Sequence, residues 1–109
     1  MGQTRKQLRE MPEEVRRGFG RALRDVQLGL TLSNAKRMTG NLRDVMEVVS
    51  NHRGDTYRVM YTADMEGRIY VLDAFKKKSK SGRATPKADI ARILKRLKEA
   101  RSHYLSGLQ

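Results

Sequence analysis

The densest group of reactive side chains in this sequence is a run of cations, Lys76-Lys77-Lys78-Ser79-Lys80-Ser81-Gly82-Arg83, with five cations in eight residues. Like charges this close repel one another, so the run favours an anionic partner, and the commonest polyanions are RNA and DNA. Crowded lysines also give up a proton more easily than isolated ones, so Lys77, Lys78 or Lys80 is a candidate proton donor or acceptor. The alternative is that the run binds phosphate without taking part in chemistry.

A single arginine inside an apolar segment is the second candidate. Arg58 stands in the run Thr56–Thr62, beside valine, methionine and tyrosine. A buried arginine needs either a partner for its charge or a function. Its planar guanidinium suits it to clamp a phosphate group. The alternative is an ion pair with Glu47 or Asp73 on a neighbouring segment.

One histidine and three tyrosines complete the candidates. His52 lies beside Arg53 in a predicted turn, where it is a candidate proton donor or RNA contact, the alternative being an ordinary surface residue. Tyr57, Tyr61 and Tyr70 alternate along predicted strands, which indicates packing in the core. Stacking of one of them on an RNA base is the alternative.

The composition excludes several classes of site. The chain has no cysteine, which excludes a disulfide framework, a thiolate metal site and a cysteine nucleophile. His52 and His103 are far apart in sequence, so we expect neither a metal site nor a cofactor. No apolar run approaches the roughly 20 residues of a membrane span, and no signal peptide is visible behind the basic N-terminus. We therefore expect a cytoplasmic protein without a membrane partner.

Length and charge narrow the class further. The 109 residues and 12.5 kDa fit one domain, residues 1–109. Lys and Arg number 24 against 12 Asp and Glu, a net charge of +12. The excess lies at the two ends of the chain: the net charge is +6 over residues 1–43, −3 over 44–75 and +9 over 76–109. This distribution favours nucleic-acid binding.

The first third of the sequence predicts two helices. Thr4 can cap a short helix over Arg5–Glu10, and Pro12 fits the first position of a longer helix that Gly29 ends. The apolar stripe of the longer helix recurs every three or four residues and consists of Val15, Phe19, Ala22, Leu23, Val26 and Leu30. The polar residues 31–44 predict a loop.

Three strand-like runs follow, Val45–Val49, Thr56–Thr62 and Arg68–Phe75. Their short connections predict antiparallel neighbours. Thr85 and Pro86 then start a C-terminal helix. The predicted fold class is α+β, with two N-terminal helices, a small antiparallel sheet of three or four strands, and a C-terminal helix. We expect the helices to pack on one face of the sheet.

Four segments, residues 11–16, 56–61, 70–80 and 84–90, carry a family resemblance. The most specific part is Ala-Phe-x-Lys-Lys-Ser-Lys, over residues 74–80, followed by Thr-Pro-Lys over residues 85–87. Together with the long N-terminal helix, these segments resemble the phage-derived, HigB-like branch of the RelE/ParE toxin superfamily. The resemblance spans nearly the whole chain and implies a RelE-like fold.

The resemblance implies the toxin of a type II toxin–antitoxin system. The RelE and HigB members cut messenger RNA on the ribosome without a metal ion, through attack of the ribose 2′-OH on the adjacent phosphorus. Arg58 matches the family's strand arginine, which implies that it stabilises the phosphorane oxygens. Lys77, Lys78, Lys80 and His52 are the candidates for proton transfer. The candidate RNA contacts are Lys76, Arg83, Lys87, Arg53 and Tyr57. The implied partners are a cognate antitoxin of helix-turn-helix type, the ribosome and mRNA.

Two other functions stay open. ParE members of the superfamily inhibit DNA gyrase, and a nucleic-acid-binding module without catalysis also fits the charge. The lysine run favours a ribonuclease over a gyrase inhibitor, whereas the lack of a full acid–base set keeps the non-catalytic module in view. The family usually opens with a β-strand, but only residues 1–3 precede the first helix here. We therefore expect either a sheet that lacks this strand or a trimmed chain.

Overall fold

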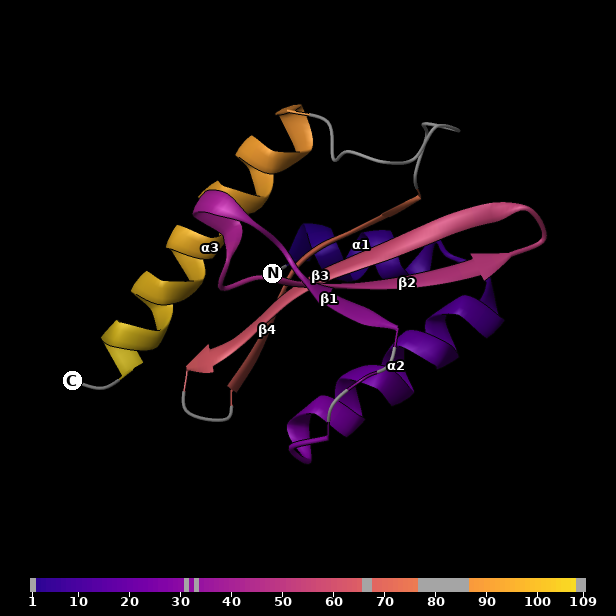
Figure 1. Cartoon of the computed structure of the whole chain (residues 1–109), viewed down its shortest axis with the longest axis horizontal. Helices are drawn as coiled ribbons and strands as arrows, with labels where there is room; N and C mark the ends of the chain where they lie inside the picture. The colour runs from indigo at the N-terminus through magenta and orange to yellow at the C-terminus, as the bar shows by residue number, and fades with distance from the viewer. Residues whose placement is uncertain (1, 31, 33, 66–67, 77–86, 108–109) are drawn as a thin grey trace.

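The computed structural model describes residues 2–30, 32, 34–65, 68–76 and 87–107. Helices α1 (Gly2–Arg9) and α2 (Glu13–Gln27) come first, followed by a short strand β1 (Ala35–Arg37) and a 3-10 turn η1 (Gly40–Leu42). Strands β2 (Met46–His52), β3 (Asp55–Met65) and β4 (Arg68–Lys76) then form hairpins, and α3 (Lys87–Gly107) closes the described chain (Figure 1). The expected α+β class is confirmed.

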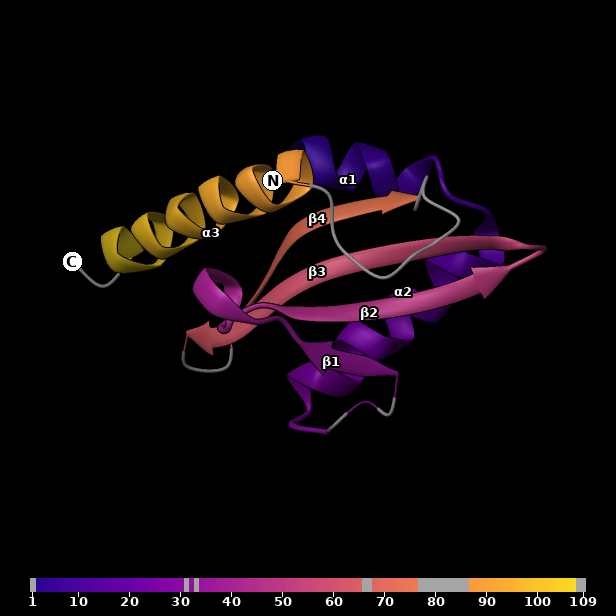
Figure 2. The same ribbon diagram turned by 45° about the horizontal axis from the view of Figure 1, so that its top comes forward.

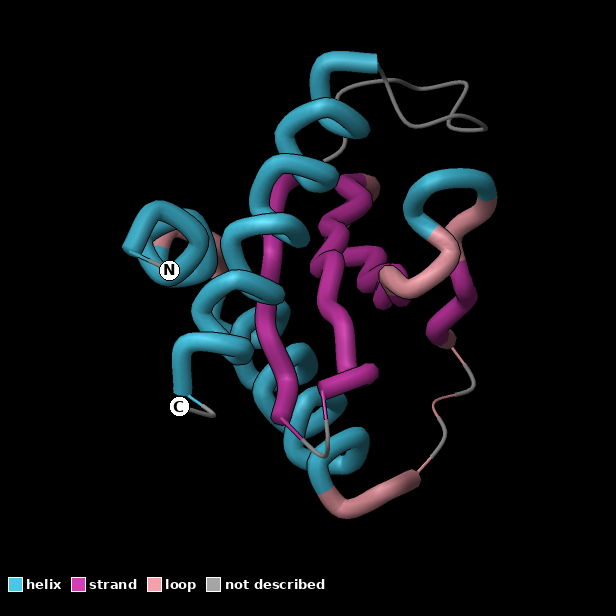
Figure 3. Tube along the Cα trace, turned by 90° about the vertical axis from the view of Figure 1, so that its left-hand side faces the viewer, coloured by secondary structure: helices cyan, strands magenta, loops and turns pink. Residues whose placement is uncertain are grey.

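The sheet has the strand order β1-β2-β3-β4, and every neighbouring pair is antiparallel. Figure 3, which looks from the α3 side, places α1 at the β4 edge and β1 with η1 at the other edge. The Thr4 hydroxyl of α1 donates to the Leu72 carbonyl of β4 at 3.3 Å. This contact replaces the predicted capping role of Thr4, because α1 begins before that residue.

The expectation that the helices share one face of the sheet is wrong. Tyr57, Val59 and Tyr61 of β3 pack with α2, whereas Met60 and Leu72 pack with α3. Figure 2 shows α2 and α3 on opposite sides of the sheet. The physical reason is that β3 and β4 carry apolar side chains on both faces, and each face needs its own cover.

The predicted loop over residues 31–44 contains β1 and η1, and this is a second correction. Ala35, Lys36 and Arg37 pair with Val48, Glu47 and Met46. Three residues are too few to show a strand periodicity, so the pairing depends on a partner that is distant in sequence. Within the described residues the sheet has four strands, but the fourth is β1, which follows α2, and not the strand with which the family usually opens.

The ends of α2 differ slightly from the prediction. Pro12 precedes the helix rather than occupying its first position, and its carbonyl accepts from the Arg16 amide at 3.0 Å. Gly29 has a φ of 84° just beyond the helix, which confirms the predicted stop. Leu30 lies outside the helix and is exposed, so it does not belong to the buried stripe.

Gly18 and Gly20 weaken α2 and should be replaceable. A Cβ atom added at either position has nothing within 4 Å beyond its immediate surroundings. We expect Gly18→Ala and Gly20→Ala each to raise the free energy of unfolding by about 0.4–1 kcal/mol, because alanine loses less backbone entropy in a helix. Urea unfolding measures the gain. Gly54→Ala should lose stability instead, because Gly54 has a φ of 84°.

Candidate functional site

Three charged side chains form a row across the α3 face of the sheet. Arg58 Nη1 on β3 lies 2.9 Å from Oε2 of Glu47 on β2, and Lys36 Nζ on β1 lies 3.6 Å from Oε1 of the same carboxylate. Glu47 is 1% exposed and Arg58 is 6% exposed, whereas the Lys36 side chain is largely exposed. With two cations and one carboxylate, the row keeps one net positive charge.

The row explains why Arg58 can stand in a buried strand. A carboxylate or guanidinium taken out of water is costly unless it is paired. Of the partners weighed for Arg58, the structure shows Glu47. Asp73 binds other arginines instead. The pairing with Glu47 orients the Arg58 guanidinium.

Arg58 also lies next to the end of β4, where the lysine run begins. Its partner in the sheet is Phe75, and Lys76 is the last residue of β4. Figure 1 shows the β2–β3 turn at the end of the sheet that points away from α3. The Arg58 end of the row therefore lies beside the start of the cationic segment, although Lys76 itself pairs with Tyr57, whose side chain faces α2.

His52, another predicted catalytic residue, is not brought to Arg58. His52 ends β2 instead of lying in the turn, and its side chain faces α2, with Nδ1 3.4 Å from Oε2 of Glu14. It therefore lies on the opposite face of the sheet from Arg58, because the sheet faces alternate along the strand. Lys77, Lys78 and Lys80 lie outside the described residues.

Those predicted RNA contacts that the structure describes are also scattered. Tyr57 is 8% exposed and belongs to the α2-side core, so the packing alternative holds for it and base stacking does not. Lys76 is exposed and its Nζ lies 3.2 Å from Oδ2 of Asp55. Arg53 is exposed in the hairpin turn with a φ of 50°, and Lys87 is exposed at the start of α3. Arg83 lies outside the described residues.

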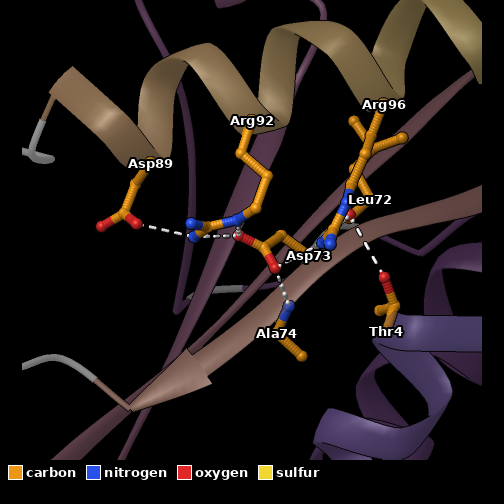
Figure 4. Close-up of polar contacts among 7 residues, drawn as sticks. All are labelled: Thr4, Leu72, Asp73, Ala74, Asp89, Arg92 and Arg96. Carbon is orange, nitrogen blue, oxygen red and sulfur yellow. Dashed lines mark hydrogen bonds and ion pairs between the residues drawn. The ribbon is translucent and has the colours of Figure 1, made fainter.

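A second charged cluster, shown in Figure 4, fixes α3 to β4. Asp73 is fully buried and its Oδ2 accepts from Arg92 Nη2 at 2.6 Å, while its Oδ1 accepts from Arg96 Nη1 at 2.7 Å. Arg96 also donates to the Leu72 carbonyl at 3.0 Å. Arg92 bonds Asp89 on its own helix at 2.6 Å.

The two aspartates favour the charged form of Arg92. Partial burial by itself lowers the pKa of Arg92, but the hydrogen bonds and charges of Asp73 and Asp89 outweigh it and raise that pKa overall. The Arg92 guanidinium also lies 5.7 Å from the centre of the Phe75 ring. Arg92 therefore stays charged and links α3 to the strand that leads into the lysine run.

Sequence reasoning missed two parts of these clusters. Lys36 was placed in a loop, and its role depends on the pairing of β1 with β2. Arg92 and Arg96 reach Asp73 from α3, a contact that the sequence analysis did not predict. The signal that could have identified them is Asp73, a carboxylate inside an apolar strand that needs a cationic partner.

The described residues form neither a metal cluster nor a membrane-spanning helix. Within those ranges, no group of three or more histidine, aspartate or glutamate side chains could hold a metal ion. None of the helices in the described part of the chain is long and apolar enough to cross a membrane.

Comparison with known protein families gives a match. The family model described as Phage derived protein Gp49-like (DUF891) matches residues 6–98, which is most of the chain. Neither the curated proteins nor the solved structures give a match.

Proposed function

The chain belongs to the Gp49-like family of phage-derived proteins, within the broad RelE/ParE-like toxin superfamily, and we propose on this basis that it is the toxin of a type II toxin–antitoxin pair. The family match over residues 6–98 is the observation that carries the proposal. The net charge of +12 supports it, because a toxin that acts on RNA must approach a polyanion.

Within that class we propose a HigB-like activity, ribosome-dependent cleavage of messenger RNA without a metal ion. In this reaction a base takes the proton of the ribose 2′-OH as its oxygen attacks phosphorus, and the phosphorane gains negative charge. The bond from phosphorus to the 5′ oxygen then breaks as an acid protonates that oxygen, which leaves a 2′,3′-cyclic phosphate. Positive charge near the phosphorane lowers the barrier. The Lys36–Glu47–Arg58 row and the adjoining lysine run are the part of the chain that we assign to this task.

Arg58 is the central residue of the proposal. Glu47 fixes the position of the guanidinium at 2.9 Å, and a fixed charge stabilises a transition state better than one that must first reorganise. Lys36 lies at the exposed end of the row, where a point charge can meet a phosphate. Lys77, Lys78 or Lys80 then remains the candidate for proton transfer.

The proposed partner is an antitoxin of helix-turn-helix type. A protein of net charge +12 favours an acidic partner, and covering the basic surface would keep the toxin inactive. At the outer edge of β4, the Leu72 carbonyl already accepts hydrogen bonds from Thr4 and Arg96. An antitoxin strand that extends the sheet would therefore pair with the β1 edge instead.

Induced expression in a bacterium tests the proposed function. We expect growth to arrest and transcripts to be cut within their translated regions, and co-expression of the adjacent small reading frame to restore growth. Intact transcripts together with gyrase-linked DNA breaks would replace the proposal with a ParE-like inhibitor. Normal growth at a verified expression level would remove the toxin assignment.

A further inference from the structure

A pocket of about 450 Å³ opens between α2 and the end of β2. Its α2 wall includes Arg17, Gly18 and Arg21, and its β2 wall includes Ser50, Asn51 and His52. His52 faces α2, whereas Arg58 faces α3, so the pocket lies on the other side of the sheet from the charged row. The proposed cleavage reaction makes no use of it.

A missing side chain helps to keep the pocket open. Gly18 lines it, and a Cβ atom added there would have nothing within 4 Å. Val15, which is buried in the α2-side core, also lines the pocket. A glycine inside a helix lowers its stability, so α2 is less stable because Gly18 leaves this space open.

The charges around the pocket suit an anion. Arg17 and Arg21 are one helical turn apart and both exposed, so their guanidinium groups rise from the same side of α2. Arg17 Nη2 contacts Glu13 at 2.6 Å, but an ion pair this exposed is weak and exchanges readily for another anion. The Glu14 carboxylate is directed at His52, 3.4 Å away. The residues of the lining itself are two arginines against the Glu14 carboxylate, and Glu13, which pairs with Arg17, lies outside the lining.

We propose that this pocket binds one phosphate-bearing nucleotide unit. Arginine forks recognise phosphate through pairs of N–H donors, and the Ser50 hydroxyl adds a donor from β2. The volume lies within the range of about 300–1,000 Å³ that is usual for small-ligand pockets. Phosphate fits better than the carboxylate of an acidic peptide, because it brings more charge and a third acceptor oxygen to two guanidinium groups.

Binding measurements with two probes test the proposal, adenosine 5′-monophosphate and a short single-stranded 2′-O-methyl oligoribonucleotide. The methyl group blocks the 2′-OH, so the oligonucleotide cannot be cut. Binding is therefore measured whether or not the protein cleaves RNA. We expect the Arg17→Gln/Arg21→Gln variant to lose roughly tenfold to hundredfold in affinity. Gly18→Gln, which fills the pocket without changing charge, should lose a comparable factor.

Matched controls come from the same helix. Arg16→Gln/Arg24→Gln removes the same charge from exposed positions that do not line the pocket, and Gly20→Gln adds the same side chain outside it. Both should stay within about threefold of the wild type at moderate salt. Thermal unfolding of every variant shows that α2 remains folded.

The outcomes separate the sources of the phosphate. If the pocket variants lose affinity for both probes, a free nucleotide is enough to occupy the pocket. If they lose affinity for the oligonucleotide alone, the pocket binds an RNA strand. Equal losses in the control and pocket variants would reduce the effect to general charge and overturn the proposal. Binding of an acidic peptide with the same dependence on Gly18, but of neither nucleotide probe, would assign the pocket to a protein partner instead. These results do not depend on whether the protein cleaves messenger RNA.

Discussion

Arg58→Ala should lower the single-turnover rate of message cleavage on the ribosome by about 10²–10³, the effect of removing one donor from a developing oxyanion. Ribosome affinity should change much less, because the lost charge matters most when the phosphorane forms. Single-turnover cleavage beside a binding titration at several salt concentrations measures both quantities.

Single Lys→Ala changes at residues 76–80 should mainly weaken binding and flatten its salt dependence by about one unit of slope per contact. A loss of turnover as well at Lys77, Lys78 or Lys80 would identify the proton carrier.

Arg58→Ala is also expected to destabilise the fold, so a second variant is needed to separate the loss of activity from the loss of stability. Without Arg58, the 1% exposed Glu47 carboxylate loses its closest cation, which costs about 3–5 kcal/mol of stability in buried pairs. Glu47→Gln/Arg58→Gln replaces the pair by two neutral amides and should recover most of that loss while cleavage stays low. Arg68→Gln, at the opposite end of β4, is the control and should cleave like the wild type. Full cleavage by the folded double variant would make Arg58 a structural residue.

The second large effect is expected at Asp73. Asp73→Ala should lower the free energy of unfolding by about 3–5 kcal/mol. The substitution removes the fully buried carboxylate with which Arg92 and Arg96 pair and leaves their charges uncompensated there. Asp89→Ala removes the other carboxylate that Arg92 contacts, at the start of α3, and should cost about 1 kcal/mol or less. Urea unfolding at neutral pH compares the two variants.

The comparison of these aspartates also tests how α3 is held. If both variants lose the same small amount, the apolar contacts of Ile93 and Leu97 hold α3 and the charged cluster adds nothing. Asp73→Asn keeps the size of the side chain but not its charge, so it should fall between the wild type and Asp73→Ala. If Asp73→Asn loses as much stability as Asp73→Ala, the negative charge of Asp73 alone accounts for its contribution to stability.

Local patterns in the sequence were sufficient for much of the fold. The stripe from Val15 to Val26 predicted α2, and Gly29 its end, because helix periodicity and glycine's left-handed conformation are properties of a short segment. The alternation of Tyr57, Val59 and Tyr61 likewise predicted one shared face of β3. The α+β order and the family resemblance follow from the same kind of local information.

Only the tertiary structure decided which charged residues meet. The sequence placed His52 and Arg58 among the candidates for one site, but strand alternation and a turn at Arg53 put them on opposite faces of the sheet. The choice of Glu47 over Asp73 as the partner of Arg58 depended on strand register and on Arg92 and Arg96 reaching Asp73 from α3. Ion pairs between distant segments are decided by packing, because a charge responds to whatever the fold brings within a few ångströms and carries no periodic signal along the chain.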